Sequence, residues 1–338
     1  MKSTLSRAEI KNLLATESPE KLTALFSCAK NIREQYFGNK IFTYGFVYFS
    51  TWCRNDCAFC YYRKSNNIDR YRKNPAEIIK LATNLAASGV NLIDLTMGED
   101  ELYHENDFAH FFDIVREIKA KTQLTIMISP GVVAPSVIDA AANAGIDWFA
   151  LYQETHNQEL FQRLRLGQCY HHRMSLKKHA ANRKMLTEEG VLTGVGETLD
   201  DIAESIIQMG EIGASQMRAM SFVPQTGTPM AVQASPQIML ELKIIAAIRI
   251  CYPGVLIPAS LDVDGISGLE RRLEAGANVV TSIIQPETGL MGVAQNSKDI
   301  EDGGRTMEQI VPILNRLGLH PATTDDYKAC IKSLRDKL

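Results

Sequence analysis

The sequence carries little net charge and lacks long apolar runs. Its 36 Lys and Arg residues nearly balance 39 Asp and Glu residues, and the formal net charge is −3. This balance gives no electrostatic case for a nucleic-acid partner, which would favour a clustered basic surface. No run of about 18 apolar residues is present, so we expect no membrane span.

Signals for secretion and for a disulfide framework are also missing. The first twenty residues contain no apolar run of the 7–15 residues, roughly, that a signal peptide needs. The chain has seven cysteines, and an odd count without a secretion signal argues against paired disulfides. We therefore expect free thiols and a place in the reducing cytoplasm.

After residue 40 the chain alternates between short apolar or β-branched runs and amphipathic stretches. This alternation predicts parallel strands joined by right-handed helical crossovers. We expect eight strands, at residues 41–50, 91–97, 124–129, 148–153, 191–195, 216–222, 255–260 and 278–284. Eight such units close naturally into a (β/α)8 barrel of the TIM type, within the α/β class. An open doubly wound sheet is the alternative, but no dinucleotide-binding glycine fingerprint follows the first strand.

Helices are expected between the strands and at both ends of the chain, and they divide it into three parts. Helices are expected between the strands at 75–89, 107–120, 199–213 and 236–250, and one or two helices at 5–37. Ser6 with Glu9 predicts a capping box, and Ser18-Pro19 predicts a second helix start. We divide the chain into an N-terminal helical extension (1–38), the barrel (39–320) and a C-terminal helical tail (321–338). The extension either plugs the lower end of the barrel or packs on its outside.

Three cysteines fall within FSTWCRNDCAFCYYR (49–63), directly after the first expected strand. Cys53, Cys57 and Cys60 are spaced C-x3-C-x2-C. Buried structural cysteines fit poorly with the polar residues between them. A zinc site would close with a fourth Cys or His, and no C-x2-C or H-x3-H pair follows downstream. An iron–sulfur cluster held by only three thiolates would leave one iron free to bind a substrate or cofactor.

The motif C-x3-C-x-aromatic-C, with Phe59 as the aromatic residue, resembles the signature of the radical S-adenosylmethionine (SAM) superfamily. Members of that superfamily have β/α barrels with the motif just after the first strand. The resemblance implies that Cys53, Cys57 and Cys60 bind a [4Fe–4S] cluster whose remaining iron binds SAM. Electron transfer from the reduced cluster then yields a 5′-deoxyadenosyl radical.

Other segments resemble the SAM-binding elements of the same superfamily. TMGED (96–100) is similar to a G-G-E motif, LYQET (151–155) ends the fourth expected strand, and GVLTGVGE (190–197) is similar to an element beside the adenine. The resemblance implies SAM contacts from Phe59, Met97, Gly98, Glu99, Ser129, Glu154, Arg173 and Gly194. The alternatives are a turn that leads into a helix for TMGED and a surface ion pair for Arg173.

A closer resemblance covers about residues 30–320. NKIFTYGFVYFSTWCRNDCAFCYYR, IDLTMGED, MISPGV, LYQET, LTGVGE, LIPASLDVDGI and AGANVVTSI together resemble the methylornithine synthase family of pyrrolysine biosynthesis. That family isomerises L-lysine to 3-methylornithine through the adenosyl radical, by Cα–Cβ fragmentation and recombination. The resemblance implies the same reaction here, with L-lysine as substrate and a flavodoxin or ferredoxin as electron donor.

Charged residues interrupt the apolar strands, as a lysine site would require. A dry cavity for lysine needs about one fixed cation and two fixed anions, because unpaired buried charge costs several kcal/mol. From the resemblance, Arg218 and Ser260 would hold the α-carboxylate, Asp262 the α-amine and Asp94 the side-chain amine. The alternative is that these residues form structural ion pairs, for example between Asp94 and Arg218.

Two other functions stay open at this point. One is a different radical SAM enzyme of the biotin synthase and hydrogenase-maturase branch, with another small-molecule substrate. The other is a non-enzymatic barrel that holds zinc at the three cysteines. His171 and His172 are expected on an exposed loop rather than at a metal site, and 297–309 is expected to be a polar loop that leads into the last helix.

Overall fold

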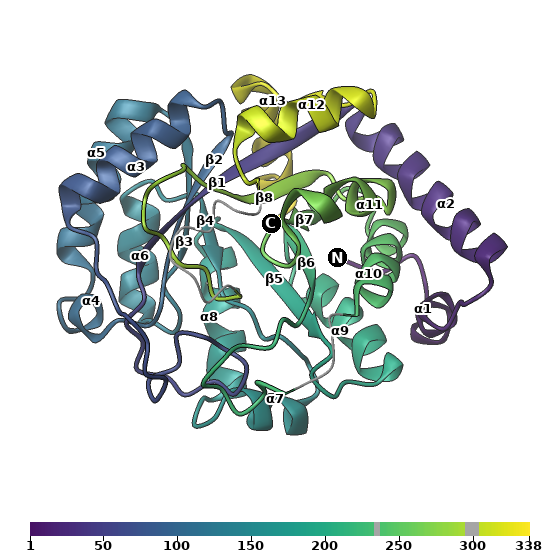
Figure 1. Cartoon of the computed structure of the whole chain (residues 1–338), viewed down its shortest axis with the longest axis horizontal. Helices are drawn as coiled ribbons and strands as arrows, with labels where there is room; N and C mark the ends of the chain where they lie inside the picture. The colour runs from purple at the N-terminus through teal and green to yellow at the C-terminus, as the bar shows by residue number, and fades with distance from the viewer. Residues whose placement is uncertain (233–236, 295–303) are drawn as a thin grey trace.

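The structure, a computed structural model, describes residues 1–232, 237–294 and 304–338. Eight parallel strands in this part of the chain follow one another around a sheet in the order β6-β5-β4-β3-β2-β1-β8-β7, with helices outside it (Figure 1). Their bounds are β1 Lys40–Ser50, β2 Leu92–Met97, β3 Thr125–Ser129, β4 Trp148–Ala150, β5 Leu186–Thr193, β6 Gln216–Ser221, β7 Pro258–Ser260 and β8 Val279–Ile283.

The sheet closes on itself between β6 and the segment that leads into β7. Gln216 and Leu256 form a parallel bridge, and the backbone N–H of Met217 donates to the carbonyl of Leu256 at 2.9 Å. The N–H of Leu256 in turn donates to the carbonyl of Ser215 at 3.1 Å. The predicted (β/α)8 barrel is therefore confirmed. In such barrels the chemistry lies at the carboxyl ends of the strands.

Helices fill the connections between the strands. Their bounds are α1 Arg7–Leu14, α2 Pro19–Phe37, α3 Pro75–Ala87, α4 Glu101–Glu105, α5 Ala109–Thr122, α6 Pro135–Asn143, α7 Gln158–Leu164, α8 Tyr170–Asn182, α9 Leu199–Glu211, α10 Ile238–Cys251, the 3-10 helix η1 Gly265–Gly268, α11 Leu269–Glu274, α12 Met307–Arg316 and α13 Thr324–Arg335. The helix expected at 236–250 is α10, and residue 236 lies outside the described residues.

One prediction about a loop was wrong, and a second could be compared with the structure only in part. His171 and His172 are exposed, as expected, but they lie in the first turn of α8. Helix α8 starts there because its buried residues, which begin at Arg173, pack on the sheet with helical spacing. Within 297–309, residues 297–303 lie outside the described residues and α12 already begins at Met307.

Three strands differ by three residues in length from those expected, and the others differ by one or two. β5 begins at Leu186 rather than at residue 191, so that two adjacent glutamates, Glu188 and Glu189, lie inside a buried strand. Such carboxylates are stable in a barrel wall only when they are paired, and the partners come from distant segments. β4 ends at Ala150, and β7 begins only at Pro258 because the preceding residues make the closing bridge.

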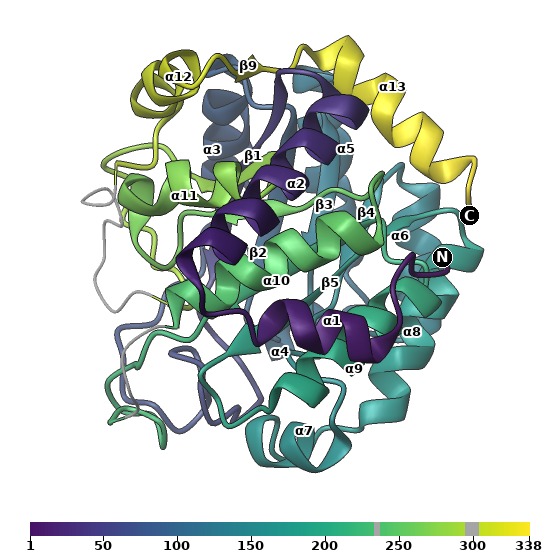
Figure 2. The ribbon, with the colours of Figure 1, turned by 90° about the vertical axis from the view of Figure 1, so that its right-hand side faces the viewer.

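The N-terminal helices pack on the outside of the barrel. Figure 2 shows α1 and α2 beside α9, α10 and α11, and contacts between these helices agree with the view. The predicted capping box of Ser6 and Glu9 is confirmed. Arg33 of α2 is buried and its Nη1 donates to the carbonyl of Leu273 at 3.1 Å, which ties α2 to α11.

The C-terminal segment lies at the amino-terminal ends of the strands, at the top of Figure 1. Strand β9 (His320–Pro321) pairs with the start of β1, and α13 follows it. The hydroxyls of Tyr44 and Tyr327 are hydrogen-bonded at 2.8 Å inside the barrel. This end is therefore filled by protein. The division of the chain at residues 38 and 320 stays a prediction, and β9 crosses the second boundary.

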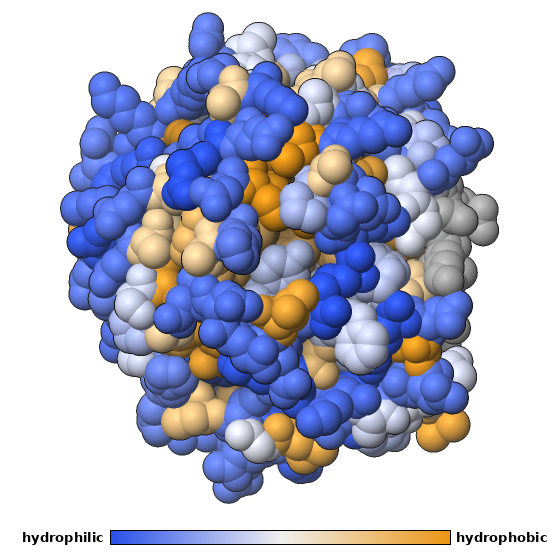
Figure 3. All heavy atoms as spheres, turned by 90° about the vertical axis from the view of Figure 1, so that its left-hand side faces the viewer, coloured by the Kyte–Doolittle hydropathy of each residue, from blue (hydrophilic) through white to orange (hydrophobic). Residues whose placement is uncertain are grey.

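The outer helices are amphipathic. Figure 3 shows a face on which hydrophilic side chains predominate and apolar atoms form separate small groups. In α5, for example, Phe111, Phe112, Ile114, Val115 and Ile118 are buried against the sheet. Among the helices that the structure describes, none has the length and apolarity to cross a membrane.

Candidate active site

A cavity of about 220 Å³ lies at the carboxyl ends of the strands. It brings together most of the residues predicted from the sequence, because parallel strands end at the same rim. The predicted residues that line it are Cys53, Phe59, Cys57, Cys60, Asp94, Met97, Gly98, Glu99, Ser129, Glu154, Arg173, Arg218 and Asp262. Ser260 and Gly194 are not among the lining residues.

The cysteine loop is fixed against the ends of β2 and α7. A side chain at Gly98 would place its Cβ 2.2 Å from the carbonyl oxygen of Trp52, so only glycine permits this approach. The N–H of Arg54 donates to the carbonyl of Glu99 at 3.0 Å, and the N–H of Ala58 donates to that of Leu164 at 2.7 Å. The thiols are therefore held by backbone contacts on both sides of the cavity.

The three thiols fit an iron–sulfur cluster. Burial is the main reason that the pKa values of Cys53 and Cys60 are raised, and the neighbouring thiols raise them further. The Cys53 and Cys60 thiolates therefore need a cationic group in order to form in this place. Among the residues described, no three His, Cys, Asp or Glu side chains converge closely enough to hold one metal ion. Thiols that share a cavity without converging on one point suit a multi-iron cluster, whose thiolates bind different irons, better than a single zinc ion.

Glu154 has a strained backbone at the end of β4. Its φ is +69°, a left-handed conformation that non-glycine residues rarely adopt and that often marks functional sites. Its Oε1 accepts from Nη2 of Arg165 at 2.7 Å, and the Arg165 guanidinium lies 5.3 Å from the ring centre of Phe59. Burial raises the pKa of the Glu154 carboxyl, and Arg165 opposes that rise.

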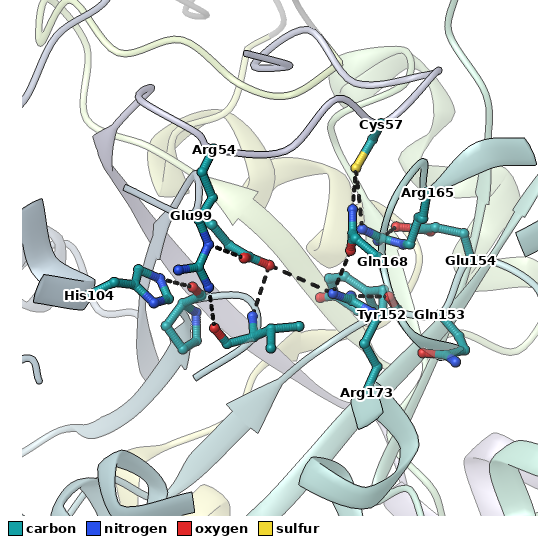
Figure 4. Close-up of polar contacts among 12 residues, drawn as sticks. Arg54, Cys57, Glu99, His104, Tyr152, Gln153, Glu154, Arg165, Gln168 and Arg173 are labelled. Carbon is teal, nitrogen blue, oxygen red and sulfur yellow. Dashed lines mark hydrogen bonds and ion pairs between the residues drawn. The ribbon is translucent and has the colours of Figure 1, made fainter. Parts of the chain in front are cut away.

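Arg173 is buried at the centre of a polar network that reaches across the cavity (Figure 4). Its Nη2 donates to the carbonyl of Tyr152 at 2.5 Å and its Nη1 to Oε1 of Gln168 at 3.1 Å. Glu99 lies 3.8 Å away and also pairs with Arg54 at 3.1 Å. Burial, together with nearby Arg165, lowers the pKa of Arg173 to about 9. The negative charge around Arg173 does not fully compensate its buried guanidinium, so this side chain is suited to bind an anionic group.

Gly194 lies in the turn that follows β5, and its predicted contact with SAM stays a prediction. Its N–H donates to Oε1 of Glu197 at 2.8 Å, and the N–H of Val195 donates to the other oxygen of Glu197 at 2.9 Å. The glycine has a φ of +83° in the turn after β5 and is not itself among the residues that line the cavity, although it lies beside Phe222, which is. The structure thus supports a role in shaping that turn.

The opposite side of the cavity is built around Arg218. Its Nε donates to Oε1 of Glu188 at 2.7 Å, and its Nη1 donates to the hydroxyls of Ser260 and Thr281 at 3.3 and 3.2 Å. Its Nη2 is buried and has no hydrogen-bond partner among the described residues. A carboxylate in the cavity could supply that partner. Ser260 lies behind Arg218 and positions it.

Asp262 is surrounded by hydrogen-bond donors. Arg305 donates to its Oδ1 at 2.8 Å, Tyr48 to the same oxygen at 3.1 Å, and Ser282 to Oδ2 at 2.7 Å. Ser260 adds a longer contact of 3.4 Å to Oδ2. Burial alone would raise the pKa of Asp262, but Arg305 and Ser282 more than offset it, and the pKa is lowered. This carboxylate stays charged at neutral pH.

Asp94 is held much more loosely. In the described part of the chain its carboxyl has one hydrogen bond, from Ser129 at 3.2 Å, and no ion pair. Burial, and then the nearby Glu188, raise its pKa to about 8, while Arg218 acts in the opposite direction. Asp94 and Arg218 form no ion pair, but structural ion pairs are present, because Arg218 pairs with Glu188 and Asp262 with Arg305.

Several site residues escaped the sequence analysis. They are Glu188, Thr281, Ser282, Arg305, Tyr48, Arg165 and Gln168. For Glu188 no local signal was available, because two adjacent glutamates followed by Gly190 favour a loop before the strand expected at 191–195. Arg305 lies in a polar segment, and no local pattern reveals that it reaches Asp262, 43 residues earlier in the chain.

The buried charges on this side of the cavity do not balance. Asp94, Glu188 and Asp262 are buried carboxyls, while Arg218 and Arg305 are buried guanidiniums. With Asp94 ionised, the set carries one excess negative charge. A ligand with one net positive charge would neutralise it, and a zwitterion with an additional ammonium group has that charge.

Comparisons with known proteins agree with this site. Residues 47–208 match the model of the radical SAM superfamily. A 3-methylornithine synthase from Methanosarcina acetivorans is 40% identical over 328 residues, which cover 97% of this chain and 93% of that protein. A crystal structure of methylornithine synthase (PylB) aligns with a TM-score of 0.92 at 40% identity and covers 96% of each chain. The [FeFe] hydrogenase maturase subunit HydE from Thermotoga maritima is 31% identical over 261 residues, which cover 76% of this chain and 74% of HydE.

Proposed function

The chain belongs to the radical SAM superfamily and, within it, to the family of 3-methylornithine synthases, and from this premise we propose that it isomerises L-lysine to 3-methylornithine. The product would serve pyrrolysine biosynthesis. The choice of substrate rests on the buried charged residues of the cavity, which carry one excess negative charge when Asp94 is ionised. Lysine has one net positive charge and would neutralise it.

The cofactors of the enzyme are a [4Fe–4S] cluster and SAM. Cys53, Cys57 and Cys60 would hold the cluster, since they share the cavity and the raised pKa values of Cys53 and Cys60 mean that their thiolates need a cationic partner. When bound, the two cofactors would supply a 5′-deoxyadenosyl radical that takes a hydrogen from Cγ of lysine, and the 5′-deoxyadenosine so formed would return a hydrogen to the product radical. All other steps depend on how the protein holds the substrate.

The chain's residues would bind SAM across the first half of the cavity. We assign the carboxylate of SAM to Arg173, whose guanidinium is buried and whose pKa is lowered by burial to about 9. Glu154, fixed by Arg165 at 2.7 Å, would accept from SAM's ribose or amino group. Phe59, Met97, Gly98 and Ser129 line the same space.

Lysine would lie across the second half, with its two ends on different strands. Its α-carboxylate would contact the free Nη2 of Arg218 on β6, its α-ammonium Asp262 beyond β7, and its side-chain ammonium Asp94 on β2. The charged groups at both ends then fix which hydrogen the radical reaches.

This arrangement explains how a fragmented substrate can be retained. Breaking the Cα–Cβ bond separates a glycyl-type fragment with the α-groups from an aminobutene with the side-chain amine. Each fragment keeps a charged anchor of its own, Arg218 with Asp262 for the first and Asp94 for the second. Buried Phe46 and Tyr48 help to exclude water from the reacting carbons. Recombination at the other alkene carbon then gives the branched skeleton.

We also propose that an acidic one-electron carrier, such as a flavodoxin or ferredoxin, docks on the cysteine loop. Residues 51–73 contain six Lys or Arg residues and two Asp residues, in a chain whose net charge is −3. Trp52, beside Cys53, is 45% exposed, and the guanidiniums of Arg70 and Arg72 lie 5.8 and 5.2 Å from its ring centre. Arg63 is buried, but the other five basic residues reach the surface, and such a surface with an exposed aromatic ring suits an acidic partner. Free thiols and an iron–sulfur cluster support a cytoplasmic location.

The test is anaerobic incubation of cluster-reconstituted protein with SAM, a reductant and isotope-labelled L-lysine, followed by chromatography and mass spectrometry. We expect a separately eluting isomer with the mass of the labelled lysine. Cys57→Ala serves as the control and should form neither the isomer nor 5′-deoxyadenosine. If the unmodified enzyme forms 5′-deoxyadenosine but no isomer, lysine is not the substrate and a maturase-like activity becomes the better proposal.

A further inference from the structure

Gln168 bridges the cysteine loop and the arginine assigned to SAM. Its Nε2 donates to Sγ of Cys57 at 3.0 Å, and its Oε1 accepts from Nη1 of Arg173 at 3.1 Å. Figure 4 shows the amide between these two groups. The Sγ of Cys57 stands here for the thiolate that would bind an iron of the cluster. One side chain thus contacts both a cluster ligand and the SAM carboxylate site.

The position of Gln168 is fixed by the turn between α7 and α8. Its backbone N–H donates to the carbonyl of Arg165 at 3.0 Å, and Gly167 has the left-handed φ of +72° that this turn requires. The cysteine loop is attached to the end of α7 by the bond between Ala58 and Leu164, at 2.7 Å. The distance between the amide and the thiol is therefore set by the backbone on both sides.

Arg165 is the other donor near this sulfur, but it is less suited to the role. Its Nη1 lies 3.7 Å from Sγ of Cys57, and its Nη2 is committed to Glu154 at 2.7 Å. Its charge is thus shared with a carboxylate. Gln168 supplies the shorter hydrogen bond, and its own acceptor contacts the Arg173 cation, which polarises the amide and strengthens its N–H as a donor.

We propose that Gln168 is a positioning residue that links the SAM carboxylate site to the reduction potential of the cluster. This inference rests on the proposed function. Reduction adds negative charge to the cluster and its thiolates, and a hydrogen bond to a thiolate stabilises that charge. The Gln168 amide therefore raises the reduction potential, so that the cluster accepts an electron more readily while Arg173 is held ready for SAM.

The test is an electron paramagnetic resonance redox titration of reconstituted Gln168→Met protein. Methionine keeps the length of the side chain and removes the N–H donor. We expect a more negative midpoint potential, by up to about 59 mV, which corresponds to a tenfold change in a one-electron equilibrium constant. The matched control is Gln162→Met on the exposed face of α7, which should keep the potential of the unmodified protein. Iron content and visible absorbance establish that each variant holds a full cluster.

Two further variants identify the donor as the cause. Gln168→Glu keeps an acceptor for Arg173 but loses the N–H donor, and its potential should fall at least as far as that of Gln168→Met. Gln168→His restores an N–H donor and should recover most of the loss. The proposal is overturned if Gln168→Met and Gln168→Glu keep the unmodified potential, or if Gln168→His falls as far as Gln168→Met. The titration contains no lysine, so a failure to form methylornithine would count against the proposed function alone.

Discussion

Asp262 and Asp94, the two carboxylates assigned to the ammonium groups of lysine, have opposite environments. Asp262 accepts hydrogen bonds from Arg305, Tyr48 and Ser282, and its pKa is lowered chiefly by Arg305. Asp94 accepts one hydrogen bond, from Ser129, and burial raises its pKa to about 8. The first carboxylate is already charged in the free protein, while the second lacks the cation that would keep it charged.

This difference assigns separate tasks to the two ends. A compensated carboxylate can orient an ammonium group without a change in its own protonation. A buried carboxylate without a cationic partner is stabilised most when a cation binds, because an unpaired buried charge is unfavourable. Asp94 should therefore contribute more to substrate affinity, and Arg305 with Asp262 more to the stability of the fold. The variants below test that division.

The largest effect is expected from Asp94→Asn. The amide cannot pair with an ammonium group, so lysine should bind at least about a hundredfold more weakly and turnover should be lost. The free energy of unfolding should change little, since Asp94 has no ion pair in the described residues. Equilibrium dialysis with labelled lysine and denaturant unfolding measure the two quantities. Asp113→Asn on exposed α5 is the control, and unchanged cluster absorbance shows that the site is intact. Full activity of Asp94→Asn would refute the assignment.

Arg305→Met should act chiefly on stability. It removes the cation from a buried ion pair and leaves the Asp262 carboxylate with hydroxyl donors only, so we expect a loss of about 3 kcal/mol in the free energy of unfolding. Urea titration measures this loss. The double variant Arg305→Met with Asp262→Asn should recover part of it, because no buried charge remains. A double variant that is less stable than Arg305→Met would contradict the explanation.

Lysine affinity should depend on pH through Asp94. Below the pKa of about 8 this carboxyl carries a proton that has to leave before an ammonium group can pair with it. Affinity should therefore fall up to about tenfold for each pH unit below that value. The free energy of unfolding depends on pH in the opposite direction. The raised pKa contributes stability at low pH, and that contribution is lost as the pH rises towards 8. Lysine binding to Asp94→Asn, although weak, should lack this slope; an equal slope in both proteins would assign the titration elsewhere.

Tyr48→Phe should have the smallest effect. It removes one of several hydrogen-bond donors to Asp262, while the ring keeps its packing. The free energy of unfolding should fall by about 0.5–1.5 kcal/mol. Because Asp262 keeps the Arg305 cation and the Ser282 hydroxyl, lysine affinity should change by less than about threefold, with turnover of bound lysine nearly unchanged. Steady-state kinetics with saturating SAM separates the two constants. A loss comparable to that of Asp94→Asn would mean that Tyr48 contacts the substrate itself.

The sequence predicted the part of the site that depends on local spacing. The cysteine motif and the residues that follow strands β2 and β4 were identified because each is a short continuous segment at the barrel rim. The barrel itself followed from the alternation of strands and helices. The strand bounds were less accurate where the chain departs from regular pairing, as at the closing bridge between Gln216 and Leu256.

The part that depends on distant partners could not be predicted. Glu188 is stable inside β5 because the side chain of Arg218 on β6 pairs with it, and a local pattern of two adjacent glutamates favours a loop instead. Arg305 reaches Asp262 from a polar segment near the end of the chain. Gln168 contacts Cys57 across 111 residues of sequence. Each contact exists because the barrel brings separate strand ends to one rim.

The most direct test of the account is a crystal structure of the anaerobically reconstituted enzyme with SAM and L-lysine bound. We predict that the side-chain nitrogen of lysine lies within hydrogen-bonding distance of Asp94, and that its α-carboxylate contacts Nη2 of Arg218. The α-nitrogen should lie beside Asp262. A lysine bound in the reverse direction, or one that leaves Asp94 without a cation, would contradict the assignment of the two ends and with it the proposed retention of the fragments.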